Sequence, residues 1–274
     1  MTQSATEAQP KAKKNKLSSG FFRFVLTRFL LIIPTVFILV TIVFFVMRAT
    51  GDPISAALGG RLTPEELVKA YREAGYSILA ITDHEAPYDH TDLSTSEFLL
   101  LTGYEAYIRP SHTCAYDPYK AEVHLNLLAK DPHNVGIVGY DPHFCKYMPQ
   151  ELAQQRPHLG ELGPRRYYQA YIQEFIDDAI LGGYLVAYNH PCWSMEAEEA
   201  VLSYEGCYSV EVFNTGSQCI NGYESNMALY DKFLRRGKFL YLHGADDNHN
   251  HKPFGDLLCD SFRPWTQVLA KDLG

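Results

Sequence analysis

An uncharged apolar run near the N-terminus restricts the possible structures of this chain more than any other feature. Nineteen consecutive residues, Phe29 to Met47, carry no charged side chain. As an α-helix they would extend about 29 Å at about 1.5 Å per residue, which is close to the thickness of a bilayer core. We therefore expect a transmembrane helix over residues 21–48. The alternatives are a buried core helix, which would normally show a polar face, and a cleaved signal peptide, whose apolar region is shorter.

The distribution of charge orients this helix and separates it from the rest of the chain. Residues 1–61 carry a net charge of +6, and six of their basic side chains precede Phe29. By the positive-inside rule, residues 1–20 form a basic cytoplasmic tail of a single-pass membrane protein. Residues 62–274 carry −14, which repels polyanions, so we expect no nucleic-acid partner. The six cysteines are scattered without a C-x-x-C pair, and we expect them to be reduced, as in intracellular domains.

The segment around the apolar run is similar to a known membrane protein family. The stretch from Arg23 to Leu67 (RFVLTRFLLIIPTVFILVTIVFFVMRATGDPISAALGGRLTPEEL) resembles the N-terminus of dipeptide/oligopeptide ABC transporter permeases, with their Gly-Asp-Pro turn after the first helix. This resemblance implies an alternative function as a membrane component of such a transporter, with its other subunits as partners. No second apolar span follows residue 61, however, and one helix cannot enclose a substrate path. We therefore interpret residues 49–61 as the junction of a chimera; an unrelated anchor on a divergent enzyme is the alternative.

After the junction the sequence changes to alternating helical and strand-like patterns. Thr63, Pro64 and Glu66 form a capping-box signature that predicts a helix ending near Ala74. Further helical patterns cover residues 165–181 and 223–236. Apolar runs of strand length occur at residues 76–82, 98–108, 123–129, 184–188, 208–213 and 239–243. The alternation predicts an α/β fold with a mainly parallel sheet, either open or closed into a barrel.

Imidazole and carboxylate side chains lie in these strands or directly after them. They are His84, Glu105, His124, His190, Asp247 and His249. Functional side chains gather at the carboxyl ends of parallel strands, so we expect these six to lie together. This mixture of ligands suits hard and borderline divalent metals, whereas a thiolate site would use cysteines. A single histidine after a strand is commonly a hydrogen-bonded residue without function, but six ligand-type residues at strand ends favour a metal site.

Several short motifs of this region resemble those of the polymerase and histidinol phosphatase (PHP) superfamily of metal-dependent hydrolases. The motifs are LTPEELVKAYREAGYSILAITDHE, TGYE, HLNLL, YNHP and DDNHN, and the similarity extends from about Leu62 to the end of the chain. The resemblance implies a distorted (β/α)7 barrel with up to three zinc, manganese or iron ions. It also implies hydrolysis of a small-molecule phosphoester, carboxyl ester or carbamate by metal-activated water, with no further catalytic side chain, in a domain that looks cytoplasmic.

The resemblance also implies a role for each matching residue. Glu105 would bridge two metals, and His124 and His190 would hold one of them. His84 and His249 would hold a third metal. These assignments follow the family's motifs residue by residue and concern the metal ligands alone.

Four further residues have less definite roles. Asp247 would serve the first metal, with the adjacent Asp246 as the alternative. Asp83 is interpreted as a residue that orients a ligand histidine or as a group at the strand end, and His143 as the loop histidine that approaches a substrate.

One element of the PHP pattern is missing. The family's first strand carries a His-x-His ligand pair, and in this chain no histidine precedes His84. We therefore predict a barrel without its usual first strand, with fewer than three metals and impaired activity. A catalytically inactive metal-binding domain is a further alternative.

Overall fold

The computed structural model describes residues 19–50, 62–110, 121–145, 147–249 and 252–271. The chain divides into two compact units, Met1–Gly59 and Gly60–Gly274, which are described separately. Most of the predicted basic tail and junction, including residues 51–61, lies outside the described residues.

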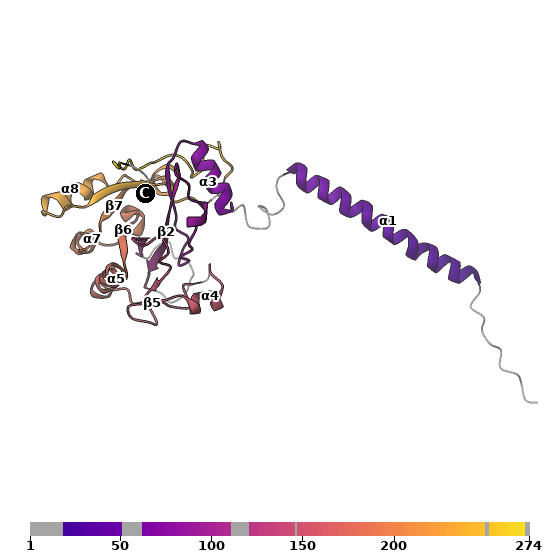
Figure 1. The fold of residues 1–274 in the computed structure, drawn as a ribbon, viewed down its shortest axis with the longest axis horizontal. Helices are drawn as coiled ribbons and strands as arrows, with labels where there is room; N and C mark the ends of the chain where they lie inside the picture. Colours follow the sequence, from indigo (N-terminus) through magenta and orange to yellow (C-terminus); the bar gives the residue numbers. More distant parts are fainter. Residues whose placement is uncertain (1–18, 51–61, 111–120, 146, 250–251, 272–274) are drawn as a thin grey trace, which may run out of the picture. The chain divides into compact units, whose positions relative to one another are not determined.

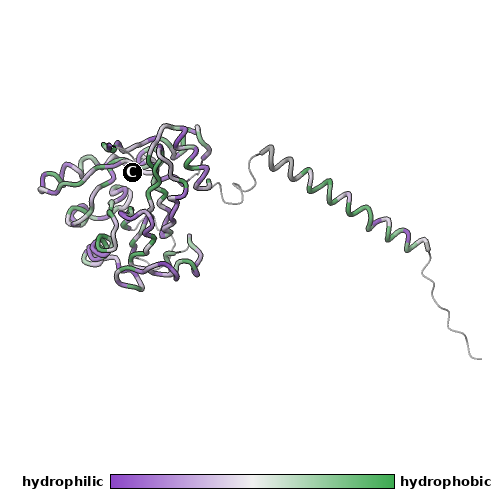
Figure 2. The backbone as a smooth tube through the Cα atoms, viewed as in Figure 1, coloured by the Kyte–Doolittle hydropathy of each residue, from purple (hydrophilic) through white to green (hydrophobic). Residues whose placement is uncertain are grey.

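The first unit contains helix α1 (Ser19–Thr50), which covers the predicted membrane segment. Within it, Gly20–Ile42 is long and apolar enough to cross a membrane, with a mean hydropathy of 2.4 over an 18-residue window (Figure 2). The hydroxyl groups of Thr35 and Thr41 donate to the carbonyl oxygens of Leu31 and Phe37, at 2.8 and 2.7 Å. Such internal hydrogen bonds allow threonine to lie in an apolar environment. A signal sequence near the N-terminus can also meet these criteria of length and composition.

A curled mixed sheet of six strands forms the centre of the second unit. Its strands are β1 (Ile78–Ile81), β2 (Leu99–Ile108), β3 (Val123–Ala129), β6 (Tyr184–Tyr188), β7 (Ser209–Asn214) and β8 (Tyr241–Ala245), in the order β1-β2-β3-β6-β7-β8. Each coincides with a predicted strand to within a few residues. The sheet is mainly parallel, as expected: β1, β2, β6, β7 and β8 run in one direction, and β3 runs antiparallel to β2 and β6. In the described part of the chain β1 and β8 are edge strands, so the sheet is open and the seven-fold count of a closed barrel stays a prediction.

The remaining elements are shorter or lie around this sheet. The helix α3 (Pro64–Glu73) begins as predicted: Thr63 Oγ1 accepts from Glu66 N at 3.3 Å, and Glu66 Oε2 accepts from Thr63 N at 2.9 Å. The helix α5 (Gln169–Leu181) begins four residues later than predicted. The others are η1 (Thr91–Leu93), β4 (Ile137–Val138), α4 (Gln150–Gln155), β5 (His158–Leu159), α6 (Pro191–Ser194), α7 (Glu198–Ser203), η2 (Thr215–Ile220) and α8 (Met227–Arg235).

The alternation of side chains along the strands separates the core from the site. The helices α5, α7 and α8 lie beside the sheet (Figure 1). Residues of these helices pack with the apolar side chains of one face of the sheet in one buried cluster. From the strands this cluster takes Tyr104, Ala106, Ile108, Val123, Leu125, Leu127, Tyr184, Val186, Tyr188, Val210 and Val212. Because successive side chains of a strand point to opposite faces, Glu105 and His124 point to the other face. The predicted ligands are therefore carried by a rigid, packed sheet.

A fully buried ion pair lies beside this sheet. Arg165 Nη1 and Nη2 bind Glu85 Oε1 and Oε2 at 2.5 and 2.8 Å, and neither side chain is exposed. The same guanidinium donates to the carbonyl oxygens of Gly139, Tyr107 and Val138. Glu85 directly follows His84 and adopts a positive φ of 55°. The ion pair thus fixes the backbone next to a predicted ligand.

Candidate metal centre

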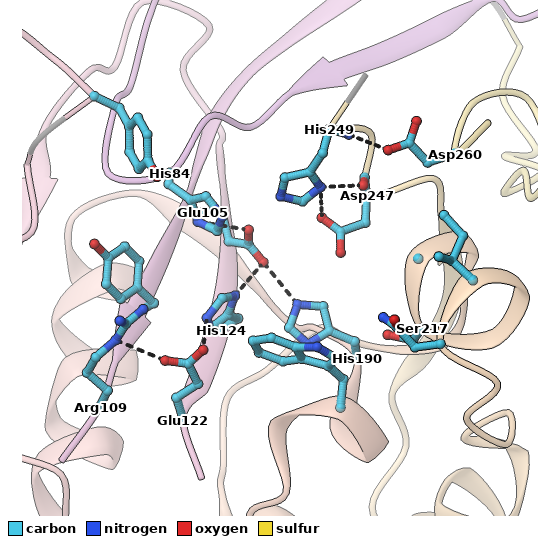
Figure 3. A pocket seen from close by; sticks show the side chains of 16 residues that line it. His84, Glu105, Arg109, Glu122, His124, His190, Ser217, Asp247, His249 and Asp260 are labelled. Atoms are coloured by element: carbon cyan, nitrogen blue, oxygen red, sulfur yellow. Dashed lines mark hydrogen bonds and ion pairs between the residues drawn. The ribbon is translucent and has the colours of Figure 1, made fainter. Parts of the chain in front are cut away.

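The six predicted ligands line a single cavity of about 340 Å³ in the second unit (Figure 3). His84 follows β1, Glu105 lies in β2, and His124 lies in β3. His190 follows β6, while Asp247 and His249 follow β8. The structure therefore brings the six residues together as expected. Their roles as metal ligands stay a prediction.

The carboxylate of Glu105 lies at the centre of three imidazoles. Its Oε2 is 3.1 Å from His84 Nδ1, and its Oε1 is 3.2 Å from His124 Nδ1 and 3.3 Å from His190 Nε2. Asn189 Nδ2 also donates to Oε1, at 2.6 Å. The ligand atoms of His84, Glu105 and His124 all lie within 4.8 Å of one another. This spacing is suitable for one bound metal ion.

Electrostatics couple these groups strongly. Burial disfavours the charged form of Glu105, but His84 and His124 outweigh burial and hold its pKa well below the usual value. Burial also opposes protonation of His124, yet the charges of Glu105 and Glu122 raise the pKa of His124 to about 10. For His84, burial is the largest effect and lowers its pKa. In the metal-free protein, a proton on His124 therefore balances the charge of Glu105.

The turn at His190 is held in an uncommon conformation. His190 has a φ of 28° and its backbone N–H donates to Glu211 Oε2 at 2.6 Å. Burial raises the pKa of Glu211 well above the usual value. The ring of Trp193 lies 4.8 Å from that of His190 and 5.1 Å from that of His124. Positive φ values at non-glycine residues persist where the surroundings enforce them, and here they aim His190 at Glu105.

Asp247 and His249 approach the same cavity from the turn after β8. Asp247 has a φ of 52°, and Asn214 Nδ2 donates to its Oδ2 at 3.1 Å. His249 Nδ1 lies 2.8 Å from the carbonyl oxygen of Asp247, and its ring is 6.0 Å from the ring of His84. These two residues therefore form the wall next to His84.

The residues given secondary or alternative roles do not line the cavity. Asp246 turns toward Tyr71 and accepts from its hydroxyl at 2.7 Å, so of the two aspartates it is Asp247 that faces the cavity. The side chain of Asp83 is exposed and no contact to a ligand histidine is seen; its carbonyl oxygen accepts from Glu105 N at 3.3 Å. His143 is 67% exposed and pairs with Asp141. Asp83 thus lies at the end of β1, and the roles of Asp83 and His143 stay predictions.

Two cavity residues that the motifs did not identify, Glu122 and Arg109, form a series of side-chain contacts behind His124. Glu122 Oε1 is 3.4 Å from His124 Nε2, and Arg109 Nε is 2.9 Å from Glu122 Oε2. The Arg109 guanidinium lies over the ring of Tyr107, 4.5 Å from its centre. Glu122 is two residues before His124, which in an extended segment places both on one face; this spacing is the signal that could have found it. A carboxylate behind a ligand histidine orients its ring.

The donor set fits a divalent metal of the predicted class. The cavity contributes imidazole nitrogens and carboxylate oxygens, which suit zinc, manganese or iron. The five described cysteines form no disulfide with one another and none lines the cavity; Cys114 lies outside the described residues. A buried carboxylate among three imidazoles is a charge arrangement that a cation would stabilise.

Comparisons with known proteins add little to this description. No protein-family model matches the sequence, and no curated protein matches it. Among solved structures, the chain is similar to the crystal structure of "a putative metal-dependent phosphoesterase" from Bifidobacterium adolescentis. The two share 17% sequence identity with a TM-score of 0.44, over 71% of this chain and 85% of the other. At this identity and TM-score, the similarity assigns neither a substrate nor a metal to the chain.

Proposed function

We propose that residues 62–274 form a metal-dependent hydrolase of the PHP type that cleaves small-molecule phosphate esters. The observation that carries this proposal is the convergence of His84, His124 and His190 on the buried carboxylate of Glu105 inside one cavity. Burial opposes protonation of these imidazoles, and neutral imidazole nitrogens together with a carboxylate oxygen form a ligand set for a divalent cation.

The cavity offers ligands for more than one cation. His84, Glu105 and His124 would hold the first, with His190 beside them. Asp247 and His249 would contribute to a second, next to His84. A bound divalent ion would supply Lewis acidity and lower the pKa of coordinated water, which is the chemistry that ester hydrolysis requires.

The other cavity residues favour a phosphate ester over a carboxyl or carbamate ester. Arg109 is the one lysine or arginine among the described residues that line the cavity. A guanidinium matches the geometry and charge of phosphate oxygens. Tyr147 and Trp193 also line the cavity, where their rings would exclude water from the bound ester. Asn189 holds Glu105 in place by donating to Oε1.

The test uses the full chain in detergent, loaded with Mn²⁺ or Zn²⁺ and assayed with p-nitrophenyl phosphate, bis(p-nitrophenyl) phosphate and p-nitrophenyl acetate. We expect metal-dependent turnover of the phosphate substrates and its loss in Glu105→Gln, which keeps the shape but removes the charge. The matched control is Glu97→Gln, because Glu97 is an exposed carboxylate paired with Arg72. A wild-type protein that binds no metal would refute the proposal. Metal binding without turnover would favour the inactive metal-binding alternative.

Helix α1 would anchor this hydrolase in a membrane, as its apolar segment Gly20–Ile42 suggests. The cytoplasmic position of the N-terminus remains an expectation from charge. Among the described residues α1 is the single candidate span, so no structural observation favours the transporter-component alternative or the chimera.

A further inference from the structure

A segment near the C-terminus lies against the turn that carries Asp247 and His249. We call residues 259–263 the C-terminal strap. The backbone N–H groups of Phe262 and Arg263 donate to Asp246 Oδ2 and Oδ1, at 2.7 and 3.0 Å. The strap therefore binds the residue directly before Asp247.

The strap also binds the two residues that follow Asp247, Asn248 and His249. Asn248 Nδ2 donates to Ser261 Oγ at 2.7 Å, and His249 N donates to Asp260 Oδ2 at 2.7 Å. Residues 246, 248 and 249 are thus tied to the strap, while Asp247 faces the cavity. Asp247 has a positive φ of 52°, a conformation that persists when the surrounding contacts enforce it. The strap supplies such contacts on both sides of this residue.

Asp246 connects the strap to the rest of the fold. Besides the two strap amides, its carboxylate accepts from the hydroxyl groups of Tyr71 in α3 and Thr215 in η2, at 2.7 and 3.3 Å. Its oxygens are therefore occupied by four donors. The ring of Phe262 packs on that of Tyr71, with 4.8 Å between their centres. The strap is held by packing as well as by hydrogen bonds.

We propose that the C-terminal strap positions Asp247 and His249 for cation binding, with Asp246 and Asp260 as its positioning residues. This inference rests on the proposed function and extends it to residues outside the six predicted ligands. Asp260 is 1% exposed and also lines the cavity, so the strap forms part of the cavity wall. The two adjacent aspartates then have separate roles: Asp247 faces the cavity, and Asp246 binds the strap.

The test measures Co²⁺ binding to the full chain in detergent, by titration and by visible absorption, which reports the ligand geometry of the ion. Asp246→Asn and Asp260→Asn are compared with wild type. We expect affinity about 10- to 100-fold weaker, the usual effect of removing a group that orients a ligand, together with an altered absorption spectrum. The matched control is Asp256→Asn, because Asp256 is an exposed aspartate near the strap that accepts from Leu258 N. It should bind like wild type.

A milder variant guards against loss of folding. Ser261→Ala removes the contact to Asn248 and leaves the backbone of the strap intact, so we expect a smaller weakening in the same direction. Wild-type affinity and spectrum in all three strap variants would overturn the strap proposal while leaving the proposed function standing. A wild-type protein that binds no Co²⁺ would overturn both.

Discussion

Replacing Arg165 with methionine removes the charge that compensates Glu85 in the protein interior. Methionine keeps much of the length of the side chain but makes none of the five hydrogen bonds that join Arg165 to Glu85 and to three carbonyl oxygens. Glu85 would then keep the backbone N–H of Tyr107, at 2.8 Å, as its donor. Removing one partner of a buried ion pair costs about 3–5 kcal/mol of unfolding free energy. We expect a loss of this size.

Urea unfolding of the full chain in detergent measures the loss. Tryptophan fluorescence reports on the second unit, because both tryptophans, Trp193 and Trp265, belong to it. For a domain of about 150–250 residues, 1 kcal/mol corresponds to roughly 2–4 °C in the melting temperature, so we expect a decrease of roughly 6–20 °C. The control is Arg166→Met, an exposed neighbour paired with Glu161, which should change stability by less than about 0.5 kcal/mol.

A double variant separates the charge from the packing. Adding Glu85→Gln to Arg165→Met removes the uncompensated carboxylate and should restore part of the lost stability. The reasoning would be refuted if the unfolding free energy of Arg165→Met alone lay within about 1 kcal/mol of the wild-type value. The position of Glu85 directly after His84 adds a functional consequence: the single variant should also bind metal more weakly.

Three further predictions concern the site and the membrane segment. His190→Ala should lower the metal content of desalted protein, measured by elemental analysis; unchanged content would show that His190 is not a ligand. Because the pKa of His124 is raised to about 10, this residue is protonated at pH 8, and metal binding should release about one proton, measured by calorimetry in two buffers of different ionisation enthalpy. The raised pKa of His124 also stabilises the metal-free fold. This stabilisation is fully present at a pH below about 6.5, the pKa of histidine in the unfolded chain, and it is lost as the pH rises through about 10. Finally, the full chain should stay in the membrane pellet after an alkaline carbonate wash, and its recovery in the supernatant would contradict anchoring by α1.

The strands were predictable because each is a short run of mainly apolar residues of strand length. The capping box at Thr63 and Glu66 was equally local, and the structure confirms it. The direction of β3 was not predictable in this way, because an alternating apolar pattern is the same in parallel and antiparallel strands. The late start of α5 was not predictable either, because the backbone before it is fixed by a distant residue: Arg165 N donates to Asp141 Oδ2, and Tyr168 is extended.

The six candidate ligands could be identified from residue type and position alone, since imidazoles and carboxylates that follow strands meet at one edge of a sheet. The choice between Asp246 and Asp247 required the structure, because adjacent residues share the same sequence context and differ in their partners. Glu122 could have been found from its two-residue spacing to His124. Asp260 gave no such signal, since its partner His249 is brought to it by the path of the chain.

The local patterns of residues therefore specify α1, the capped helix, the strand positions and the chemical type of the site, because these depend on neighbours within a few residues. Tertiary structure specifies the Glu85–Arg165 ion pair and the hydrogen bond from Tyr71 to Asp246. Their partners are far apart along the chain: 80 residues separate Glu85 from Arg165, and 175 separate Tyr71 from Asp246. Contacts of this kind form only when the whole sheet and its helices have packed, since packing offsets the entropy of bringing such distant residues together.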